Sequence, residues 1–234
     1  MLVSGRNNVK EILRNFTELD SVKKAYCQDN FNENDILDLL NKRKIKIEYK
    51  KKIEMDHLIN NNHQGIILDV KDFVYTNLEN IIIDKDDCFL VILDHLEDPH
   101  NLGAIVRTVE AAGVDGIILP QNRSVSVNET VMKTSVGALY SVKIASVVNL
   151  NNTIKYLKNN GFWIIGSDMD GEDYHKINYP KKVALVIGSE GFGMTRIVRE
   201  SCDFIAKIPM KGKINSLNAS VAAGILIYGI ANNK

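Results

Sequence analysis

The chain has 234 residues, of which 45% are hydrophobic and 25% are charged, a composition typical of a globular protein with one large or two small domains. No segment reaches the roughly 18 uninterrupted apolar residues of a membrane span, and residues 1–13 lack the apolar stretch of a secretion signal, so we expect a cytoplasmic protein. The 29 basic and 29 acidic residues cancel, so the overall charge does not by itself indicate a nucleic-acid partner.

The three cysteines indicate neither a disulfide framework nor a metal site. Cys27, Cys88 and Cys202 lie far apart, are odd in number and match no metal-ligand spacing. We therefore predict that they are small, buried apolar residues and that the protein has no metal.

The first 70 residues predict a small α/β unit. Apolar side chains recur at helical spacing in two segments, the first through Val9, Ile12, Leu13 and Phe16, and three short apolar runs have the pattern of strands. The following residues, 71–87, mix isolated apolar positions with acids, so we place a domain boundary there. The predicted helices span residues 8–16 and 33–43, and the predicted strands span residues 22–27, 44–49 and 65–70.

A basic run lies within this unit, at residues 42–52. Its sequence, KRKIKIEYKKK, holds seven basic residues and one acidic residue. Such a run is suited to contact a phosphate backbone, and Lys50, Lys51 and Lys52 are the predicted RNA-binding residues. A solvated lysine-rich edge is the alternative, and the sequence gives it equal weight.

From residue 88 onward, predicted strands and helices alternate. This alternation predicts a mostly parallel sheet with helices on both faces. Pro120 and Pro209 follow strands, and Gly161 stands where a glycine ends a helix, so the turn residues agree with the periodicity. The predicted strands span residues 89–94, 116–120, 142–147, 162–167, 183–188 and 204–209, and the predicted helices span residues 101–112, 128–138, 151–159, 194–201 and 218–231.

Three polar or glycine-rich motifs follow strands in this region: motif 1 at residues 94–107, motif 2 at 188–193 and motif 3 at 208–220. Parallel sheets bind ligands beyond the carboxyl ends of their strands, where loops and helix N-termini offer unpaired backbone N–H groups. The glycines of motif 2 match neither the dinucleotide fingerprint nor the P-loop, which argues against a nucleotide-dependent oxidoreductase or kinase. Together the three motifs predict one ligand site at this edge of the sheet.

In order and content, these motifs resemble those of the SpoU (TrmH-type) class of SPOUT RNA methyltransferases. One position departs from the family pattern, because Ala219 stands where many members carry Val. The matching residues are D-x-x-x-D-P-x-N-x-G-x-x-x-R from Asp94 to Arg107, GSEGFG from Gly188 to Gly193, IPM at 208–210 and SLNAS at 216–220.

The resemblance extends to the start of the chain and carries an expected fold. SGRNNVKEIL at 4–13 and NHQGIIL at 62–68 look like the start and end of an L30e-like RNA-binding domain. The implied α/β protein has an L30e-like domain at 1–75, a linker at 76–87 and, at 88–234, a trefoil-knot (SPOUT) domain with a mostly parallel sheet. A homodimer completes its active site. General topology rules disfavour knots, so the knot is expected from family likeness alone.

The activity implied by the resemblance is transfer of a methyl group from S-adenosylmethionine to a ribose 2′-oxygen of RNA, most similar to members that act on a guanosine of 23S rRNA. A tRNA 2′-O-methyltransferase is the alternative within the family, and the N-terminal domain disfavours it. A non-catalytic ribosome-binding protein on the same fold is a further alternative, and such a protein has no need of Arg107, Glu190 or Asn218. Methyl transfer from a sulfonium needs an in-line approach of the 2′-oxygen and removal of its proton, and it needs no metal.

By resemblance, Gly188, Ile208 and Leu217 bind the cofactor, and we expect a bulky residue at position 188 to fill the ligand's space while leaving the fold largely intact. The ordinary structural alternatives stay open: Ile208 and Leu217 as core residues, Asn101 as a helix N-cap, Glu190 as an acceptor for nearby loop N–H groups, and Ser216 and Asn218 as helix caps. The catalytic residues implied by the resemblance are Asn101, Arg107, Glu190, Ser216 and Asn218.

Among these residues, Arg107 is the one whose loss we expect to damage the chemistry most. A guanidinium has a pKa above about 12, so we expect Arg107 to hold a phosphate and to stabilise charge developing on the 2′-oxygen. Deprotonation of the hydroxyl by Arg107 is the alternative. His95 and His100 flank motif 1 and suggest a general base, an interpretation that the family pattern disfavours.

Overall fold

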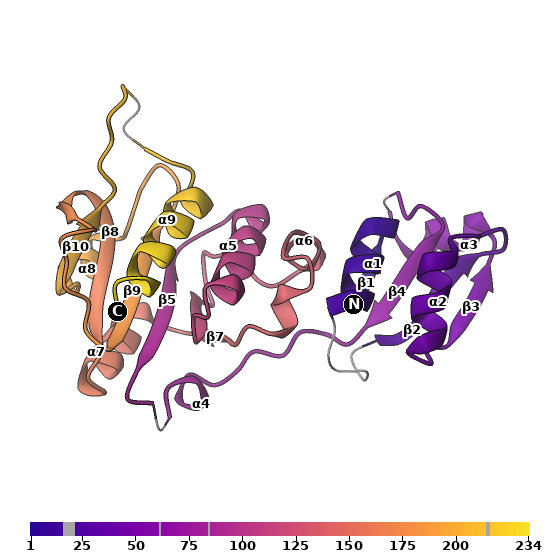
Figure 1. Cartoon of the computed structure of the whole chain (residues 1–234), viewed down its shortest axis with the longest axis horizontal. Helices are drawn as coiled ribbons and strands as arrows, with labels where there is room; N and C mark the ends of the chain where they lie inside the picture. The colour runs from indigo at the N-terminus through magenta and orange to yellow at the C-terminus, as the bar shows by residue number, and fades with distance from the viewer. Residues whose placement is uncertain (16–21, 61, 84, 214–215) are drawn as a thin grey trace. The chain divides into compact units, whose positions relative to one another are not determined.

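The computed structural model describes residues 1–15, 22–60, 62–83, 85–213 and 216–234, and its elements form two compact units (Figure 1). The first unit comprises residues 1–74 and 127–140, and the second comprises 75–126 and 141–234. Phe16, expected to continue the first helix, lies outside the described residues. No helix in the described part of the chain combines the length and apolar character needed to cross a bilayer.

A four-stranded sheet in the order β1-β4-β2-β3 is the centre of the first unit. β4 pairs antiparallel with β1 and β2, whereas β3 adds to the edge parallel to β2. The predicted helices and strands are present, and β1 and α3 are additional. The elements are β1 (Leu2–Ser4), α1 (Arg6–Asn15), β2 (Val22–Gln28), α2 (Asn34–Lys42), β3 (Ile47–Lys50), α3 (Lys52–Leu58) and β4 (Ile66–Val70).

The core of the first unit follows from its periodicity. Val9, Ile12 and Leu13 are buried on α1, which packs against α2 and against β1 and β4. A smaller cluster joins Tyr26 of β2 to residues of α3 and β4. Amphipathic patterning therefore predicts the packing face as well as the helix.

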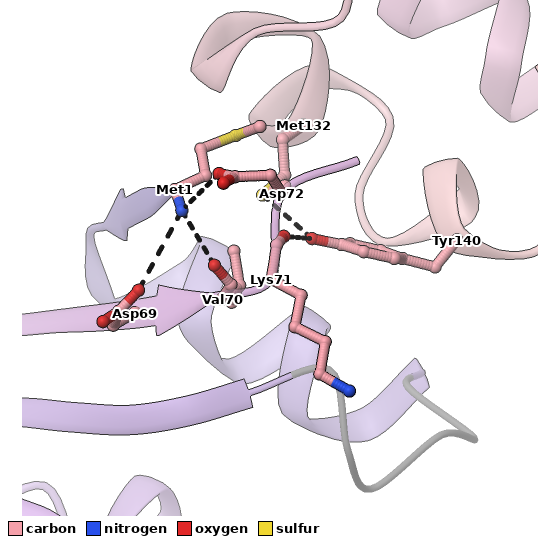
Figure 2. A network of polar contacts seen from close by, with 7 residues as sticks. All are labelled: Met1, Asp69, Val70, Lys71, Asp72, Met132 and Tyr140. Carbon is pink, nitrogen blue, oxygen red and sulfur yellow. Dashed lines mark hydrogen bonds and ion pairs between the residues drawn. The ribbon is translucent and has the colours of Figure 1, made fainter. Parts of the chain in front are cut away.

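A segment that follows β6 (Gly116–Pro120) in the chain folds with the first unit. It contains α6 (Glu129–Thr134) and the 3₁₀ helix η2 (Ala138–Tyr140). Figure 2 shows the hydroxyl of Tyr140, which lies 3.4 Å from the carbonyl oxygen of Lys71 and 3.7 Å from the sulfur of Met132. Nearby, the amino group of Met1 pairs with Asp72 at 2.9 Å (Figure 2). Burial, and to a lesser extent the negative charge of Asp72, raises the pKa of the Tyr140 hydroxyl.

The second unit is built on a six-stranded sheet in the order β10-β8-β9-β5-β6-β7, and all of its pairings are parallel. The predicted mostly parallel sheet is confirmed. The elements are α4 (Glu79–Ile82), β5 (Cys88–Asp94), α5 (Pro99–Ala111), β6 (Gly116–Pro120), β7 (Ile144–Val147), α7 (Leu150–Asn159), β8 (Trp163–Asp173), β9 (Lys182–Gly188), α8 (Arg196–Glu200), β10 (Phe204–Lys207) and α9 (Ala219–Ala231).

Helices cover both faces of this sheet, as predicted. On one face, alternate residues of β5 and β9, such as Leu90 and Val186, pack with Ile154 of α7 and Val198 of α8. On the other face, α5 and α9 lie side by side and contact β6 and β9 (Figure 1). Every residue of β5 is buried, which is typical of a central strand in such a sheet.

Two elements end at least four residues away from their predicted ends. β8 runs on to Asp173, beyond the predicted end at residue 167, and α6 ends at Thr134, before the predicted end at residue 138. Gly161 has a φ of +82° directly after the end of α7, so the predicted helix-ending glycine is confirmed.

The predicted burial of the cysteines holds for Cys27 and Cys88, whereas Cys202 is only partly buried. Burial raises the pKa of Cys27 to about 11 and that of Cys88 and Cys202 to about 12. All three thiols are therefore protonated near neutral pH.

Candidate active site

The three motifs come together at the carboxyl ends of neighbouring strands. Asp94 ends β5 and Gly188 ends β9, and these two residues are paired in the parallel register, so motifs 1 and 2 begin side by side. Motif 3 leads from β10 to the N-terminus of α9, and its residues 214–215 lie outside the described part of the chain.

One side chain from each motif contributes to a hydrogen-bonded group, here called the amide cluster: Asn101, Glu190 and Asn218. The Nδ2 of Asn101 donates to Oε1 of Glu190 at 2.9 Å, and the Nδ2 of Asn218 donates to the same oxygen at 2.6 Å. The Nδ2 of Asn218 also lies 3.0 Å from Oδ1 of Asn101. Three of the five predicted catalytic residues are thus brought into direct contact.

Local helix chemistry orients the two asparagines. Asp98 caps α5 by accepting from the backbone N–H of His100, and Pro99 occupies the first helical position. Asn101 therefore lies inside the first turn and is only 4% exposed, so its interpretation as the N-cap is wrong. Asn218 is the N-cap of α9, since its Oδ1 accepts from the backbone N–H groups of the first turn. Its Nδ2 is left for the cluster, so the cap interpretation is confirmed and the cap does not prevent Asn218 from joining the amide cluster.

Motif 2 is closed by its own backbone. Ser189 and Gly193 exchange two backbone hydrogen bonds of 3.0 and 2.9 Å, and Gly191 and Gly193 have φ angles of +81° and +67°. A Cβ on Gly188 would lie 2.1 Å from the backbone carbon of Gly193. The expectation that a bulky residue at position 188 leaves the fold largely intact is therefore wrong, because it clashes first with the loop itself.

Asp94 anchors motif 2 to the end of β5. Its carboxylate is 1% exposed and accepts from the backbone N–H and the hydroxyl of Thr195 at 2.6 and 2.9 Å. It also contacts Nδ1 of His95, which has a φ of +59°. Sequence analysis assigned Asp94 no role, although an acid directly after six buried apolar residues is the kind of signal that marks such an anchor.

A cavity of about 680 Å³ opens beside the amide cluster. Gly188, Ile208, Leu217 and Ser216 all line it, and so does Glu190. Leu217 is 37% exposed, so the interpretation of this residue as part of the core is wrong, and Ile208 is only partly buried. The predicted cofactor residues therefore share one cavity with two members of the amide cluster, Glu190 and Asn218.

The cavity wall also includes residues that sequence analysis missed, Asp168 and Met169 of β8 among them. Asp168 and Glu190 are the charged residues among the described wall residues, and both are acidic. Burial opposes ionisation of Asp168, but a hydrogen bond from Arg199 at 2.9 Å and backbone donors lower its pKa overall. The Arg199 guanidinium thus offsets the charge of Asp168, and the Glu190 carboxylate is the other acidic group of the wall.

The remaining predicted residues lie elsewhere. Arg107 is exposed on α5, and its guanidinium forms neither an ion pair nor a hydrogen bond with any described residue. In the first unit, Lys51 and Lys52 are exposed at the start of α3. The ammonium of Lys50, which is half-buried, lies 5.6 Å from the centre of the Tyr26 ring.

Two family models match the chain. Residues 88–228 match the SpoU rRNA Methylase family, and residues 2–76 match the family described as RNA 2′-O ribose methyltransferase substrate binding. A protein of Staphylococcus saprophyticus, provisionally named a TrmH family tRNA/rRNA methyltransferase, is 40% identical over 242 residues, which cover 100% of this chain and 96% of the relative.

Solved structures resemble this one over different shares of the chain. The SpoU methyltransferase AviRb from Streptomyces viridochromogenes, in complex with the cofactor AdoMet, has a TM-score of 0.80 at 21% identity and covers 99% of this chain and 89% of its own. The TrmH/SpoU tRNA modifying enzyme of A. aeolicus has a TM-score of 0.57 at 30% identity and covers 67% of this chain and 80% of its own.

Proposed function

Because the chain belongs to the SpoU rRNA methylase family of RNA methyltransferases, we propose that it transfers a methyl group to the 2′-oxygen of a guanosine ribose in 23S rRNA. The family uses S-adenosyl-L-methionine as the methyl donor. The observation that carries the proposal is the position of Glu190, which belongs to the amide cluster and also lines the cavity. The Glu190 carboxylate, held in place by the two asparagines, therefore lies beside space for a ligand.

The cavity suits S-adenosylmethionine in size and in charge. Its volume lies within the range of small-molecule sites, and the Glu190 carboxylate of its wall is complementary to a sulfonium cation. We propose that Gly188, Ile208 and Leu217 hold the cofactor through backbone groups and apolar contact. When bound, the cofactor supplies the electrophilic methyl group.

The amide cluster is proposed to orient the reacting ribose. Both amides donate to one oxygen of Glu190, which fixes the carboxylate and leaves its second oxygen available to a substrate hydroxyl. Ser216, which lines the same cavity, is a further polar contact for substrate. Rigid placement of this kind is how a site accelerates attack by a weak nucleophile.

Arg107 is proposed to hold the phosphate of the target nucleotide. Its exposed guanidinium is available for charge-assisted hydrogen bonds, and it lowers the energy of negative charge on the 2′-oxygen. Proton removal by Arg107 is the second mechanism that we consider, and the dependence of the rate on pH separates the two.

Ribosomal RNA is favoured over tRNA by the first unit. Residues 2–76 match a substrate-binding family, whereas the tRNA-modifying neighbour corresponds to only 67% of the chain. We propose that residues 1–75 recruit RNA through Lys50, Lys51 and Lys52, that 76–87 is a linker and that 88–234 is the methyltransferase domain. We propose that the protein acts on its RNA in the cytoplasm.

A homodimer is proposed on the exposed face of α9. Val221 and Tyr228 are 49% and 44% exposed and lie seven residues apart, so they share one face of the helix. A second copy that covers this face would bury both side chains. Sedimentation of a Val221→Glu variant tests the dimer. A Val148→Glu variant is its control, because Val148 is exposed but distant in sequence.

Family resemblance also supports a trefoil knot formed by motifs 2 and 3.

Methylation of defined transcripts tests the activity. The full chain is incubated with labelled S-adenosylmethionine and either 23S rRNA or tRNA transcribed in vitro, and the labelled nucleosides are identified after digestion. We expect 2′-O-methylguanosine from 23S rRNA. Label in tRNA alone would overturn the assignment to ribosomal RNA, and label on bases alone would overturn ribose methylation.

A further inference from the structure

Phe192, at the tip of motif 2, is 94% exposed, the largest exposed fraction among the large apolar residues that the structure describes. Other apolar side chains around it are also open to solvent, with Met169 at 61%, Met210 at 39% and Leu217 at 37%. All four line the same cavity. They form an apolar rim, defined by these four residues, and several exposed apolar side chains around one cavity indicate binding.

The backbone beneath Phe192 is held in place. Two hydrogen bonds between Ser189 and Gly193 close the loop, and Glu190 is held by the amide cluster. The left-handed backbone of Gly191 lies between Glu190 and Phe192, so the chain turns there. Glu190 therefore contacts the cluster while the phenyl ring two residues later projects into solvent.

We propose that Phe192 stacks against the base of the target nucleotide when that nucleotide is unpaired from its RNA. This proposal rests on the proposed ribose methylation. A 2′-oxygen that reaches a methyl donor in the cavity brings its own base to the cavity rim, where Phe192 presents the largest flat apolar surface. Aromatic side chains bind unpaired RNA bases by stacking, and every base has a face for it.

Two other uses of the ring make different predictions. A ring that covers the bound cofactor contributes to cofactor affinity, and a ring that packs against a second copy of the chain contributes to dimer stability. Either use tolerates a bulky aliphatic side chain better than stacking does, because stacking needs a flat π surface.

Kinetics of full-length variants test the proposal. Phe192→Ala, Phe192→Leu and Phe192→Trp are compared with wild type on whichever transcript, 23S rRNA or tRNA, the wild type methylates. Val148→Ala is the control, since Val148 is 73% exposed and follows β7, three strands away from β9 in the sheet. Steady-state rates give kcat and KM for RNA, calorimetry gives cofactor affinity, and sedimentation gives the oligomeric state.

We expect KM for RNA to rise about tenfold in Phe192→Ala and Phe192→Leu, as for the loss of one stacked base, and to stay within about threefold of wild type in Phe192→Trp. Cofactor affinity and oligomeric state stay unchanged. Wild-type kinetics in Phe192→Leu, weakened cofactor binding or a dissociated dimer each overturn the proposal. Ribose methylation that is unchanged in Phe192→Ala overturns this inference alone, whereas a wild type that methylates only bases overturns the proposed function beneath it.

Discussion

The two units of the molecule present their polar side chains in opposite ways. In the second unit, three residues from three distant segments share one carboxylate oxygen with donor distances of 2.6–2.9 Å. In the first, the lysines at 50–52 follow one another along the chain, and Lys51 and Lys52 are exposed. Fixed side-chain positions suit catalysis, where small displacements of the reacting groups lower the rate. Exposed charges suit attraction to RNA phosphates, which does not require precise positions. Substitutions in the two units should therefore damage different steps.

Arg107 should show the largest effect. We expect Arg107→Ala to lower turnover by about 10²–10³-fold, the range for loss of a group that stabilises developing charge, and to leave cofactor affinity unchanged. Arg107→Lys keeps the charge without the planar fork and should recover only part of the loss. Single-turnover rates and calorimetry measure the two quantities, and Arg123→Ala, an exposed arginine of the same unit, is the control.

The pH dependence of the same rates distinguishes the two roles of Arg107. A base must give a rate that rises with deprotonation of the free guanidinium, whereas an electrostatic clamp need not. If Arg107→Ala methylates RNA at nearly the wild-type rate, Arg107 is neither a clamp nor a base. It is then part of the fold or of the dimer contact.

Asn218 should show the next largest effect, and a single substitution separates its two roles. Asn218→Asp keeps the oxygen that caps α9 but replaces the Nδ2 donor with a second carboxylate oxygen facing Glu190. We expect turnover to fall about 10–100-fold, as for the loss of a hydrogen bond to a charged group. The melting temperature should fall only modestly, because the new carboxylate repels Glu190 but the helix cap is kept. Asn149→Asp, at the equivalent cap of α7, is the matched control and should change neither quantity.

If Asn218→Asp is as active as wild type, Asn218 is a helix cap and the amide cluster has no part in the reaction. If the melting temperature falls sharply instead, the cluster holds the three motifs together and its contribution to catalysis is indirect.

Sequence periodicity could predict the strands and helices because burial enforces it. Buried β5 and amphipathic α1 are examples, whereas the last part of β8 is polar and gives no apolar signal, so Asp168 and Met169 were missed. At the site, family motifs named the residues that meet. Their local roles depend on distances that no pattern contains: Asn101 has the residue type of an N-cap, but Asp98 caps the helix three residues earlier. Similarly, position 188 requires glycine because a Cβ there would clash with the backbone of Gly193.

The lysines of the first unit should show a smaller effect, confined to RNA binding. We expect the triple variant with Lys50, Lys51 and Lys52 changed to Gln to make the negative slope of log K against log salt shallower. Its magnitude should fall by up to about 0.7–0.9 for each phosphate that the protein no longer neutralises. Cofactor affinity should stay the same. A triple Gln variant at Lys155, Lys176 and Lys181, which are exposed in the second unit, is the control. An equal slope in wild type and the first triple variant would make this run a solvated surface.

The smallest effect should be on the rate of cysteine alkylation, which tests whether the two units open separately. Burial raises the pKa of Cys27 in the first unit to about 11 and that of Cys88 in the second to about 12, so at pH 8 little thiolate exists in the folded protein and alkylation requires opening. The proposed cofactor residues all lie in the second unit, so S-adenosylmethionine at four times its Kd should slow alkylation of Cys88 about fivefold and leave Cys27 unchanged. Mass spectrometry of peptides after timed exposure to iodoacetamide measures both rates, and equal protection of Cys27 and Cys88 would mean that the units open together.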